Sequence, residues 1–572
     1  MESNNPSFSY RMIDDVIKKY ESRGFWQGRV FPDYLEDNFR RFPQREALVD
    51  SRHRITFSDL NRIVNNLASN LLEMGIGKND VIGVQIPNWV EYFFIRYALA
   101  KIGAVILGIG IGMRDLEISH LLRITSAKGM VIPATFHGFS YADIMKDLRQ
   151  DLPALKYTFL IDSQEKGRSS GIYSFEALLK DRPVDDQIGG GNYRRLLKGS
   201  KEIDMLNLTS GTTGMPKICQ CIPDARMCFG RFIAERCEIT SEDTMLVVCP
   251  ITGGLGNSCS SLAAGHAGCK VVLLERFIAE EALQIIGKEK VTVLVGVPTQ
   301  YIKMLSSVDF DHYSLDSLRT VISAGSYLPY ETGKEIIKWM KAKLIPIFGS
   351  HDGGTLTIGT PDLDEETVCR TVCRPLPDAE LRLLDQNGRE VSQGEVGEIV
   401  YRSANACAGY FEDFEGTKAV FDPDGFFYSG DLGRLTKEGF LEVKGRSKDI
   451  IIRAGQNINP SEIEDILIKH PDIENVAIVG MPDPVLGERS CAYVVPKGGK
   501  TITLQSLLSF LKEKKVATFK HPERLEIIDE IPVSEGRKPA KNLLKTDIQN
   551  KLIEEGVISP SSGVGGENER LF

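Results

Sequence analysis

The chain has 572 residues, 42% of them hydrophobic and 26% charged, with a formal net charge of −9 at pH 7. This length exceeds what one ordinary hydrophobic core supports, so we expect several structural units. The negative charge argues against nucleic acid or an anionic membrane as a main partner, and no apolar run reaches membrane-spanning length. The opening stretch MESNNPSFSYRMIDD lacks a signal-peptide pattern. Eleven cysteines without paired spacing favour reduced, buried thiols in a cytoplasmic protein over a zinc site.

In chain order, the first predicted elements are helical. Residues 10–45 are amphipathic, and a short strand pair then precedes a helix that Ser58 is placed to cap. Between residues 81 and 290, apolar β-rich runs such as VIGVQIP and TMLVVCP alternate with helix-like segments. This alternation predicts a large α/β unit with mostly buried sheets, in which ligands are held at the ends of the strands.

The pattern changes after about residue 375. The turn sequences QNG and QGEVG separate alternating strands, which predicts a small antiparallel β unit. Beyond Arg446 the predicted helices and strands are short, as in an α+β unit, and Asn459, Pro460 and Glu462 form a strong helix start. The polar, Gly/Ser-rich residues 558–572 predict a flexible tail.

The stretch LTSGTTGMPK, residues 208–217, has the composition of a phosphate-binding loop. It joins two predicted strands and does not match the Walker pattern, because Met215 and Pro216 separate the last glycine from the lysine. Its glycines let backbone N–H groups converge, its hydroxyls donate hydrogen bonds, and its lysine supplies charge. The residues concerned are Thr209, Ser210, Gly211, Thr212, Thr213, Gly214 and Lys217. Taken alone, the stretch is equally compatible with a flexible polar turn.

Four further stretches place chemically useful side chains in Gly- or Pro-rich surroundings. Asp352 follows a predicted strand in IFGSHDGG, and Asp431 lies in YSGDLGRL, where we expect a tight turn. Arg446 lies in GRSKDIIIRAGQNINPSEIE, and Lys538 lies in PVSEGRKPAKNLLK.

Together these stretches resemble the adenylate-forming superfamily, which includes acyl- and aryl-CoA synthetases, aryl-acid–AMP ligases and firefly luciferase. The resemblance covers nearly the whole chain and is carried by TSGTTGMPK, SGDLG and GRSKDIIIRAGQNINPSEIE in the family's order. The N-terminal region, with GFWQ and ALVDSRHRITFSDLN, is most similar to the aryl-acid branch.

The resemblance implies a domain organisation and a reaction. The expected parts are an N-terminal adenylation domain at residues 1–447, with a β-barrel-like subdomain at about 376–447, a hinge at Lys448, and a mobile α+β C-terminal domain at 449–557. A carboxylate attacks the α-phosphate of ATP and releases pyrophosphate, and a thiol then attacks the acyl-adenylate and releases AMP. ATP, Mg²⁺ and CoA are the implied cofactors, and the product is a thioester.

The resemblance also implies roles for individual residues. Lys538 bridges the substrate carboxylate and the α-phosphate, which stabilises the crowded anionic transition state. The loop from Thr209 to Lys217 holds the β- and γ-phosphates, and Asp352 holds Mg²⁺. The remaining implied roles are ribose or phosphate binding by Asp431 and Arg446, adenine binding by Gly325, Ser326, Phe348, Gly349, Ser350 and His351, acyl binding by Thr252, Gly253 and Gly254, and a thiol channel at Gly455. The competing interpretations are ordinary ones: a turn aspartate for Asp431, a surface ion pair for Arg446 and a solvated loop lysine for Lys538.

Several positions depart from the family's pattern. Arg537 stands where a glycine usually precedes the lysine, and Pro539 follows it, so the loop around Lys538 is stiffer and more basic than usual. His351 replaces a common Thr or Ala, and Asp352 is shorter than the usual Glu.

The departure in CPITGGLGNSCSS, residues 249–261, bears on the substrate. Gly253, Gly254 and Leu255 stand where aryl-acid ligases carry a His-Asn-aromatic run whose Asn faces the ring hydroxyl. Without that Asn a hydroxybenzoate is disfavoured, and the two glycines are expected to open apolar room. A compact ring such as benzoate or cyclohexanecarboxylate fits this room, and so does a branched or medium-length acyl chain.

The leading hypothesis is therefore an AMP-forming carboxylate–CoA ligase whose reaction is reversible in principle. Its nearest rival is a ligase that loads an aryl acid onto the phosphopantetheine arm of a carrier protein. A rival of another class is a nucleotide-binding protein without turnover, suggested by the departures around Lys538. A homodimer is the expected oligomeric state for a chain of this size.

Overall fold

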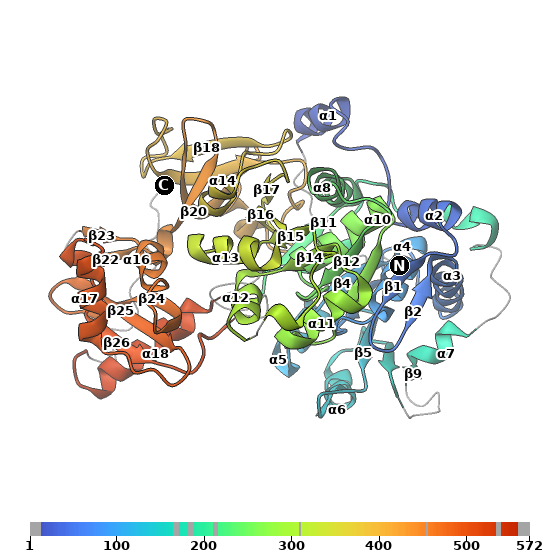
Figure 1. Ribbon diagram of the computed structural model, residues 1–572. Helices are drawn as coiled ribbons and strands as arrows, with labels where there is room; N and C mark the ends of the chain where they lie inside the picture. Colours follow the sequence, from blue (N-terminus) through green and yellow to red (C-terminus); the bar gives the residue numbers. More distant parts are fainter. Residues whose placement is uncertain are drawn as a thin grey trace.

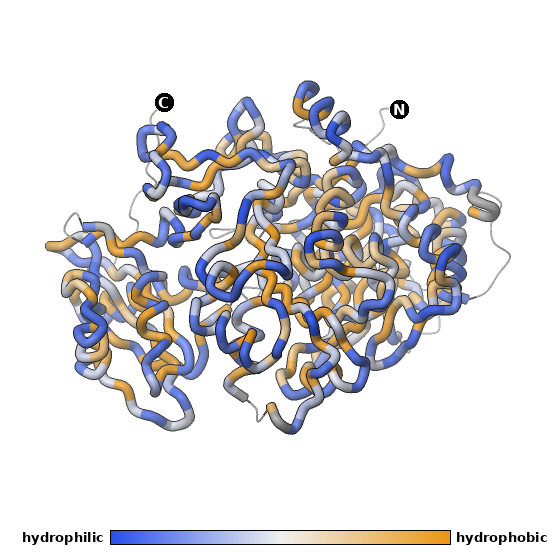
Figure 2. The backbone as a smooth tube through the Cα atoms, turned by 45° about the horizontal axis from the view of Figure 1, so that its top comes forward, coloured by the Kyte–Doolittle hydropathy of each residue, from blue (hydrophilic) through white to orange (hydrophobic). Residues whose placement is uncertain are grey.

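The computed structural model describes residues 13–163, 171–180, 188–209, 216–307, 310–453, 456–533 and 539–558. Within them the chain forms a large unit built on two mainly parallel sheets, a small antiparallel sheet, and a C-terminal α+β unit that lies to one side (Figure 1). Apolar segments concentrate inside these units, and hydrophilic ones follow the outer loops and helices (Figure 2). None of the described helices is long and apolar enough to cross a membrane.

The first large sheet has eight strands, and its central six are parallel. Both faces are covered, so the inner strands are mostly apolar, as the alternating pattern predicted. In spatial order the strands are β17 (Gly354–Ile358), β16 (Lys343–Ser350), β15 (Thr320–Ser323), β14 (Val293–Gly296), β12 (Thr244–Val247), β13 (Lys270–Leu273), β1 (Glu46–Val49) and β2 (Arg54–Thr56).

The second large sheet has seven strands and carries the predicted phosphate loop at one edge. Only its edge pair, β10 with β11, is antiparallel. In spatial order the strands are β11 (Ile218–Cys221), β10 (Met205–Leu208), β4 (Val105–Gly108), β3 (Val81–Val84), β5 (Gly129–Pro133), β8 (Tyr157–Ile161) and β9 (Ile172–Ser174). A two-stranded ribbon, β6 (Thr135–Phe136) with β7 (Phe139–Ser140), lies beyond β5.

Helices cover the faces of both sheets. The helices of this part are α1 (Asp14–Ser22), α2 (Pro32–Arg41), α3 (Phe57–Glu73), α4 (Glu91–Lys101), α5 (Asp115–Ile124), α6 (Tyr141–Leu148), α7 (Phe175–Leu179), α8 (Pro223–Arg236), α9 (Gly254–Asn257), α10 (Ala264–Ala267), α11 (Ala279–Glu289), α12 (Pro298–Ser307), α13 (Tyr330–Met340), α14 (Glu365–Arg370) and α15 (Phe414–Lys418). Two details differ from expectation. The helical region 10–45 is split, because Gly24 and Gly28 adopt positive φ between α1 and α2. The cap of α3 is Thr56, whose side chain accepts a hydrogen bond from the Asp59 N–H, rather than Ser58.

A buried ion pair ties α4 to the strand that leads into the predicted phosphate loop. Every residue of α4 is buried, including Arg96, whose Nη2 lies 2.7 Å from Oδ2 of Asp204. The guanidinium also stacks on Phe31, with 4.4 Å between its central carbon and the ring centroid. Asp204 immediately precedes β10, so the pair fixes the start of that strand to the helix layer.

The small antiparallel unit predicted after about residue 375 is present. Its strands are β18 (Glu380–Leu384), β19 (Gly397–Arg402), β20 (Phe427–Leu435) and β21 (Leu441–Arg446). They pair in chain order and leave β18 and β21 at the two edges, so this sheet is open rather than a closed barrel.

The C-terminal unit packs helices on both faces of a five-stranded sheet. Its strands are β23 (Gln456–Ile458), β22 (Ile451–Arg453), β25 (Gly487–Pro496), β24 (Ile473–Asp483) and β26 (Arg524–Ile527), and its helices are α16 (Pro460–Leu467), α17 (Leu504–Glu513) and α18 (Lys541–Glu554). The predicted start of α16 is confirmed: the Asn459 side chain accepts a hydrogen bond from the Ser461 N–H, and Pro460 occupies the first turn.

Among the described residues, three polar contacts join this unit to the large one. Lys303 of α12 pairs with Glu530 at 2.9 Å, and Glu331 of α13 pairs with Lys469 at 3.1 Å. The third is a hydrogen bond of 2.6 Å from the hydroxyl of Tyr327, in the loop after β15, to Asp465 of α16. Figure 1 shows α16 beside α13, in agreement with these contacts.

Candidate active site

The predicted phosphate loop connects β10 to β11 as expected. The two strands pair as far as Leu208 and Ile218, and the Thr209 N–H donates a 2.9 Å hydrogen bond to the carbonyl oxygen of Lys217. Thr209 and Lys217 therefore stand opposite each other at the base of the loop. The predicted phosphate-binding residues Ser210, Gly211, Thr212, Thr213 and Gly214 lie outside the described residues.

Asp352 lies in the turn between β16 and β17, as predicted, and faces β11. Its Oδ1 accepts a hydrogen bond of 3.1 Å from the Cys219 thiol, and its side chain is also in hydrogen-bond contact with the Tyr410 hydroxyl. Lys217 Nζ lies 4.7 Å from the centroid of the Tyr410 ring. Tyr410 therefore links the predicted magnesium ligand to the lysine at the base of the phosphate loop. Burial raises the pKa of the Tyr410 hydroxyl far above its usual value, so it remains a donor to the carboxylate.

The donor set around Asp352 fits a magnesium ion. Mg²⁺ in nucleotide sites takes one or two carboxylates together with phosphate oxygens and water, and Asp352 offers one carboxylate beside the base of the loop. The thiol of Cys219 is buried, which raises its pKa, so it is held as a neutral donor and adds no second negative charge.

Another acidic cluster, Asp50, His53 and Glu91, is compact enough to hold a metal ion within the described part of the chain. Arg52 already supplies a positive charge there, because its Nη2 contacts both carboxylate oxygens of Glu91 at 2.8 Å. This cluster is an ion-pair network rather than a metal site.

Asp431 and Arg446 form a cross-strand pair. Arg446 Nε donates to Asp431 Oδ1 at 2.9 Å, and the two residues are directly opposite in the β20–β21 pairing. The expected tight turn at Asp431 is wrong, because β20 continues through this stretch as it pairs with β19 and β21 on its two sides. Gly430, at φ 69°, and bulges in both pairings accommodate the bend that the glycine-rich sequence suggested.

The charges of the two predicted acidic residues, Asp352 and Asp431, act on the same tyrosine. The hydroxyl of Tyr401 is buried and donates a 2.8 Å hydrogen bond to the carbonyl oxygen of Gly354. Burial raises its pKa, and the charges of Asp431 and Asp352 raise it further. Both carboxylates are therefore close enough to this hydroxyl to raise its pKa.

Lys448 lies in a single 3₁₀ turn, Ser447–Asp449, between the antiparallel sheet and the C-terminal unit. Burial lowers the pKa of its ammonium group, with the charge of Arg446 acting in the same direction. The turn touches both neighbours: Ser447 Oγ donates to the Gly430 carbonyl at 3.1 Å, and Asp449 pairs with Lys545 of α18 at 3.3 Å. This position suits the predicted hinge. The thiol-channel residue Gly455 and the catalytic candidate Lys538 lie outside the described residues.

The predicted adenine-binding residues lie at the carboxyl end of the first sheet. Gly325, at φ 91°, and Ser326 follow β15, whereas Phe348, Gly349 and Ser350 end β16. At Gly349 a side chain would collide with the backbone of Gly354 and Thr355 on β17. Tyr327, the residue after Ser326, donates a hydrogen bond from its hydroxyl to Asp465. Burial raises the pKa of the Asp465 carboxyl to about 6.

The predicted acyl-binding residues follow β12. Asn88 holds this segment, because its side chain donates to the Cys249 carbonyl at 3.0 Å and accepts from the Ile251 N–H at 3.0 Å. Thr252 is buried, and Gly253 caps the short helix α9, which begins at Gly254.

The expectation that both glycines open room for the acid is wrong at Gly254. A Cβ built there would lie 2.8 Å from Cε1 of His351, and closer still to Nε2 and Cδ2, so the imidazole occupies that space. At Gly253 a Cβ would meet only the Pro250 carbonyl oxygen, at 3.3 Å. The Gly253 side is therefore less crowded than the Gly254 side, although the Pro250 carbonyl oxygen lies close to it.

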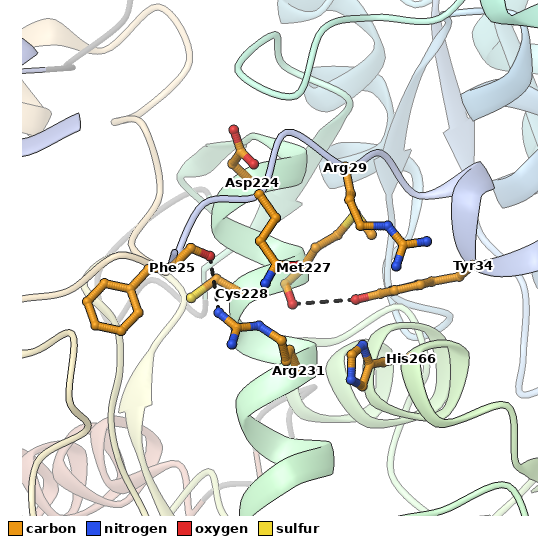
Figure 3. Close-up of a pocket in the computed structure, with 9 residues that line it drawn as sticks. Phe25, Arg29, Tyr34, Asp224, Met227, Cys228, Arg231 and His266 are labelled. Atoms are coloured by element: carbon orange, nitrogen blue, oxygen red, sulfur yellow. Dashed lines mark hydrogen bonds between the residues drawn. The ribbon is translucent and has the colours of Figure 1, made fainter. Parts of the chain in front are cut away.

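A small crevice lies beside α8 (Figure 3). Arg231 Nη2 donates to the Gly24 and Phe25 carbonyls at 3.1 and 3.3 Å, and Tyr34 donates to the Met227 carbonyl at 3.5 Å. The crevice forms where the segment after α1 wraps around α8, and none of the predicted site residues lines it.

The sequence interpretation missed Cys219, Tyr410 and Tyr401 as parts of the site. Cys219 carried a signal, since it alternates with Cys221 on a strand next to the phosphate loop, but such a pattern is also typical of an ordinary buried strand. Tyr401 and Tyr410 lie far along the chain from Gly354 and Asp352, with which their hydroxyls form hydrogen bonds, and no local pattern marks them.

Two mainly parallel sheets, a smaller α+β unit, and the contacts of Lys217 and Asp352 with Tyr410 are the fold and site expected of the adenylate-forming class. The sequence profile of the AMP-binding enzyme family matches residues 35–411, and that of the AMP-binding enzyme C-terminal domain matches residues 462–538. The chain therefore belongs to the AMP-binding enzyme family, and the expected superfamily is confirmed.

Individual relatives cover almost the whole chain. The medium-chain fatty-acid–CoA ligase of Escherichia coli is 29% identical over 94% of this chain and 93% of the relative. The salicyl-AMP ligase / salicyl-S-ArCP synthetase of Mycobacterium tuberculosis is 31% identical over 91% of each. The crystal structure of the anthranilate CoA ligase AuaEII in complex with anthranoyl-AMP has a TM-score of 0.84 at 22% identity, and covers 92% of this chain and 98% of that one. These matches confirm the expected fold and the expected enzyme class, an AMP-forming acid–thiol ligase.

Proposed function

We propose that the chain activates a small aryl or cyclic carboxylic acid with ATP and transfers the acyl group to CoA. The observation that carries this proposal is the junction of Lys217, Tyr410 and Asp352, which brings a cation and a carboxylate together at the base of the phosphate loop. Transfer of an adenylyl group needs positioning and charge neutralisation more than covalent help from the protein, and this junction supplies both kinds of charge.

In the first half-reaction a carboxylate oxygen of the acid attacks the α-phosphorus of ATP, and pyrophosphate leaves. Thr209 and Lys217 hold the terminal phosphates with the loop between them, and Asp431 accepts hydrogen bonds from the ribose hydroxyls. Lys538 stabilises the charge that builds up between the carboxylate and the α-phosphate. Bound Mg²⁺, held by Asp352, would neutralise phosphate charge.

In the second half-reaction the thiol of CoA attacks the acyl carbon, and AMP leaves. One channel mouth cannot hold both the lysine loop and the incoming thiol, so the C-terminal unit turns about Lys448 between the steps. Gly455 then lines the thiol channel. The hinge turn, with contacts to both units, supports this proposal.

Two alternatives have specific support among the relatives. The salicyl-AMP ligase / salicyl-S-ArCP synthetase supports a carrier-protein acceptor in place of CoA, and the medium-chain fatty-acid–CoA ligase supports a longer acid. The imidazole that fills the Gly254 side favours the compact acid over the longer one.

A panel of acids tests the proposal. Benzoate, cyclohexanecarboxylate, salicylate, hexanoate and octanoate are each incubated with the purified chain, ATP, Mg²⁺ and CoA, and AMP release and thioester formation are measured. We expect the two unsubstituted rings to give the highest kcat/KM. Turnover only when a phosphopantetheinylated carrier protein replaces CoA would favour the first alternative, and an acid-independent release of AMP would contradict the proposal.

A further inference from the structure

The ring of His351 is anchored between two segments of the proposed site. His351 immediately precedes Asp352, and its Nδ1 lies 2.9 Å from the carbonyl oxygen of Leu208, the last residue of β10 before the phosphate loop. A carbonyl oxygen only accepts hydrogen bonds, so Nδ1 carries the proton and donates. This bond fixes the ring plane and directs the other half of the imidazole, with Nε2, towards α9.

Gly254 is the residue that the imidazole meets. The glycine begins α9, and its backbone does not adopt the positive φ that side chains avoid. A side chain is excluded there by its neighbour, because any Cβ would overlap Nε2, Cδ2 and Cε1 of His351. The two residues are 97 positions apart in the chain, so the small residue at 254 and the large one at 351 are complementary in volume.

The neighbouring glycine shows that this fit is local. Gly253 also has an ordinary backbone conformation, at φ −88°, but a Cβ there would approach only the Pro250 carbonyl oxygen. The segment after β12 is therefore closed by the imidazole on one side and less crowded on the other.

We propose that His351 determines the size of the acid, because its imidazole forms the wall of the acyl pocket on the Gly254 side. The inference rests on the proposed function, in which Thr252, Gly253 and Gly254 contact the acid. The hydrogen bond to Leu208 holds the wall in place, so the pocket does not lengthen in this direction when a longer acid enters. The substrate is accordingly a compact acid whose bulk lies towards Gly253, and a linear medium-length chain is rejected.

The first test replaces the ring but keeps its anchor. In His351→Asn the side-chain amide nitrogen takes the place of Nδ1 and still donates to Leu208, whereas the half of the ring over Gly254 is absent. A methylene in an apolar pocket changes kcat/KM by about 10-fold or more. We therefore expect the ratio of kcat/KM for octanoate to that for benzoate to rise by about 10-fold or more, through KM for the acid.

The second test reverses the fit. Gly254→Ala adds a methyl group where the imidazole lies, and we expect it to lower kcat/KM for the compact acid by about 10-fold or more and to lower the melting temperature. In the double variant Gly254→Ala/His351→Asn the methyl group has room. Its kcat/KM for the compact acid and its melting temperature should therefore be close to those of His351→Asn alone. Gly77→Ala is the matched control, because a Cβ at Gly77 meets nothing within 4 Å.

The outcomes separate the inference from the proposed function. If none of the acids in the panel causes the unmodified chain to release AMP, the proposed function is wrong. The melting temperatures of the two single variants and of the double variant then still test the contact between residues 254 and 351. If the chain is active but His351→Asn leaves acid selectivity unchanged, the inference is wrong and the proposed function stands. Additive effects of the two substitutions on melting temperature would also overturn it.

Discussion

The proposed ribose contact of Asp431 predicts a specific loss when its carboxylate is removed. In the structure Asp431 is 16% exposed and its partner Arg446 is 42% exposed, so their ion pair contributes less than about 1 kcal/mol. A hydrogen bond to a charged group contributes about 1.5–3 kcal/mol. For Asp431→Ala we therefore expect kcat/KM for ATP to fall roughly 10- to 150-fold, since each 1.36 kcal/mol is tenfold in rate. Water replaces part of the lost contact, so the loss does not exceed that of one such hydrogen bond.

Nucleotide analogues distinguish this role from a structural one. The unmodified chain should use 2′-deoxy-ATP and 3′-deoxy-ATP less well than ATP, because each analogue lacks one hydroxyl donor. Asp431→Ala should use all three almost equally. Glu442→Ala is the matched control, because Glu442 is a carboxylate on the neighbouring strand whose ion pair with Arg434 is 2.6 Å long. If Asp431→Ala keeps the full preference for ATP over both analogues, Asp431 does not bind the ribose.

Three further predictions concern catalysis and stability. Lys538→Ala should abolish acid-dependent pyrophosphate exchange but leave thioester formation from a supplied acyl-adenylate largely intact; equal loss of both steps would exclude the proposed role. Arg96→Met should lower the free energy of unfolding by about 3–5 kcal/mol, because it leaves Asp204 charged and buried. Adding Asp204→Asn should recover much of this loss in urea titrations, and a destabilisation that persists in full would contradict the explanation. Burial raises the pKa of Asp378 to about 6, so the folded chain holds a proton that the unfolded chain loses near pH 4, and stability falls as pH rises through this window. The stabilising effect of Asp378→Asn relative to the unmodified chain should therefore grow by up to about 3 kcal/mol between pH 4 and pH 7, and a constant difference across this range would contradict the assigned pKa.

Much of the fold could be predicted because its signals are local. Apolar runs bounded by glycine marked the parallel strands, and Asn459 with Pro460 marked the start of α16. Local signals failed where neighbouring residues offered the same chemistry. Thr56 and Ser58 are both good helix caps, and only the position of the first helical turn chooses between them. The glycine before Asp431 suggested a turn, but pairing on both sides keeps this stretch within a strand.

The individual residues of the candidate site could be predicted from the sequence, but the contacts between them could not. Motifs located Asp352 and the phosphate loop along the chain, because each has a distinctive local composition. The complementarity of Gly254 and His351 has no such signature, since each residue is explained only by the other's position in space. The same holds for Tyr410, which reaches Asp352 from the far side of the second sheet's edge strand.

The sparse contacts between the C-terminal unit and the large unit have an energetic consequence. The two ion pairs, Lys303 with Glu530 and Lys469 with Glu331, are exposed, so each contributes less than about 1 kcal/mol and is screened by salt. The Tyr327–Asp465 hydrogen bond adds about 1.5–3 kcal/mol. Together these three contacts contribute only a few kcal/mol, which is the size of the preference that a ligand can exert between two states. The unit's hydrogen bond from the Asn459 side chain to the Lys444 carbonyl lies close to the proposed hinge at Lys448. If the C-terminal unit turns about Lys448 as proposed, exchanging one bound ligand for another is sufficient to change its preferred orientation without unfolding either unit.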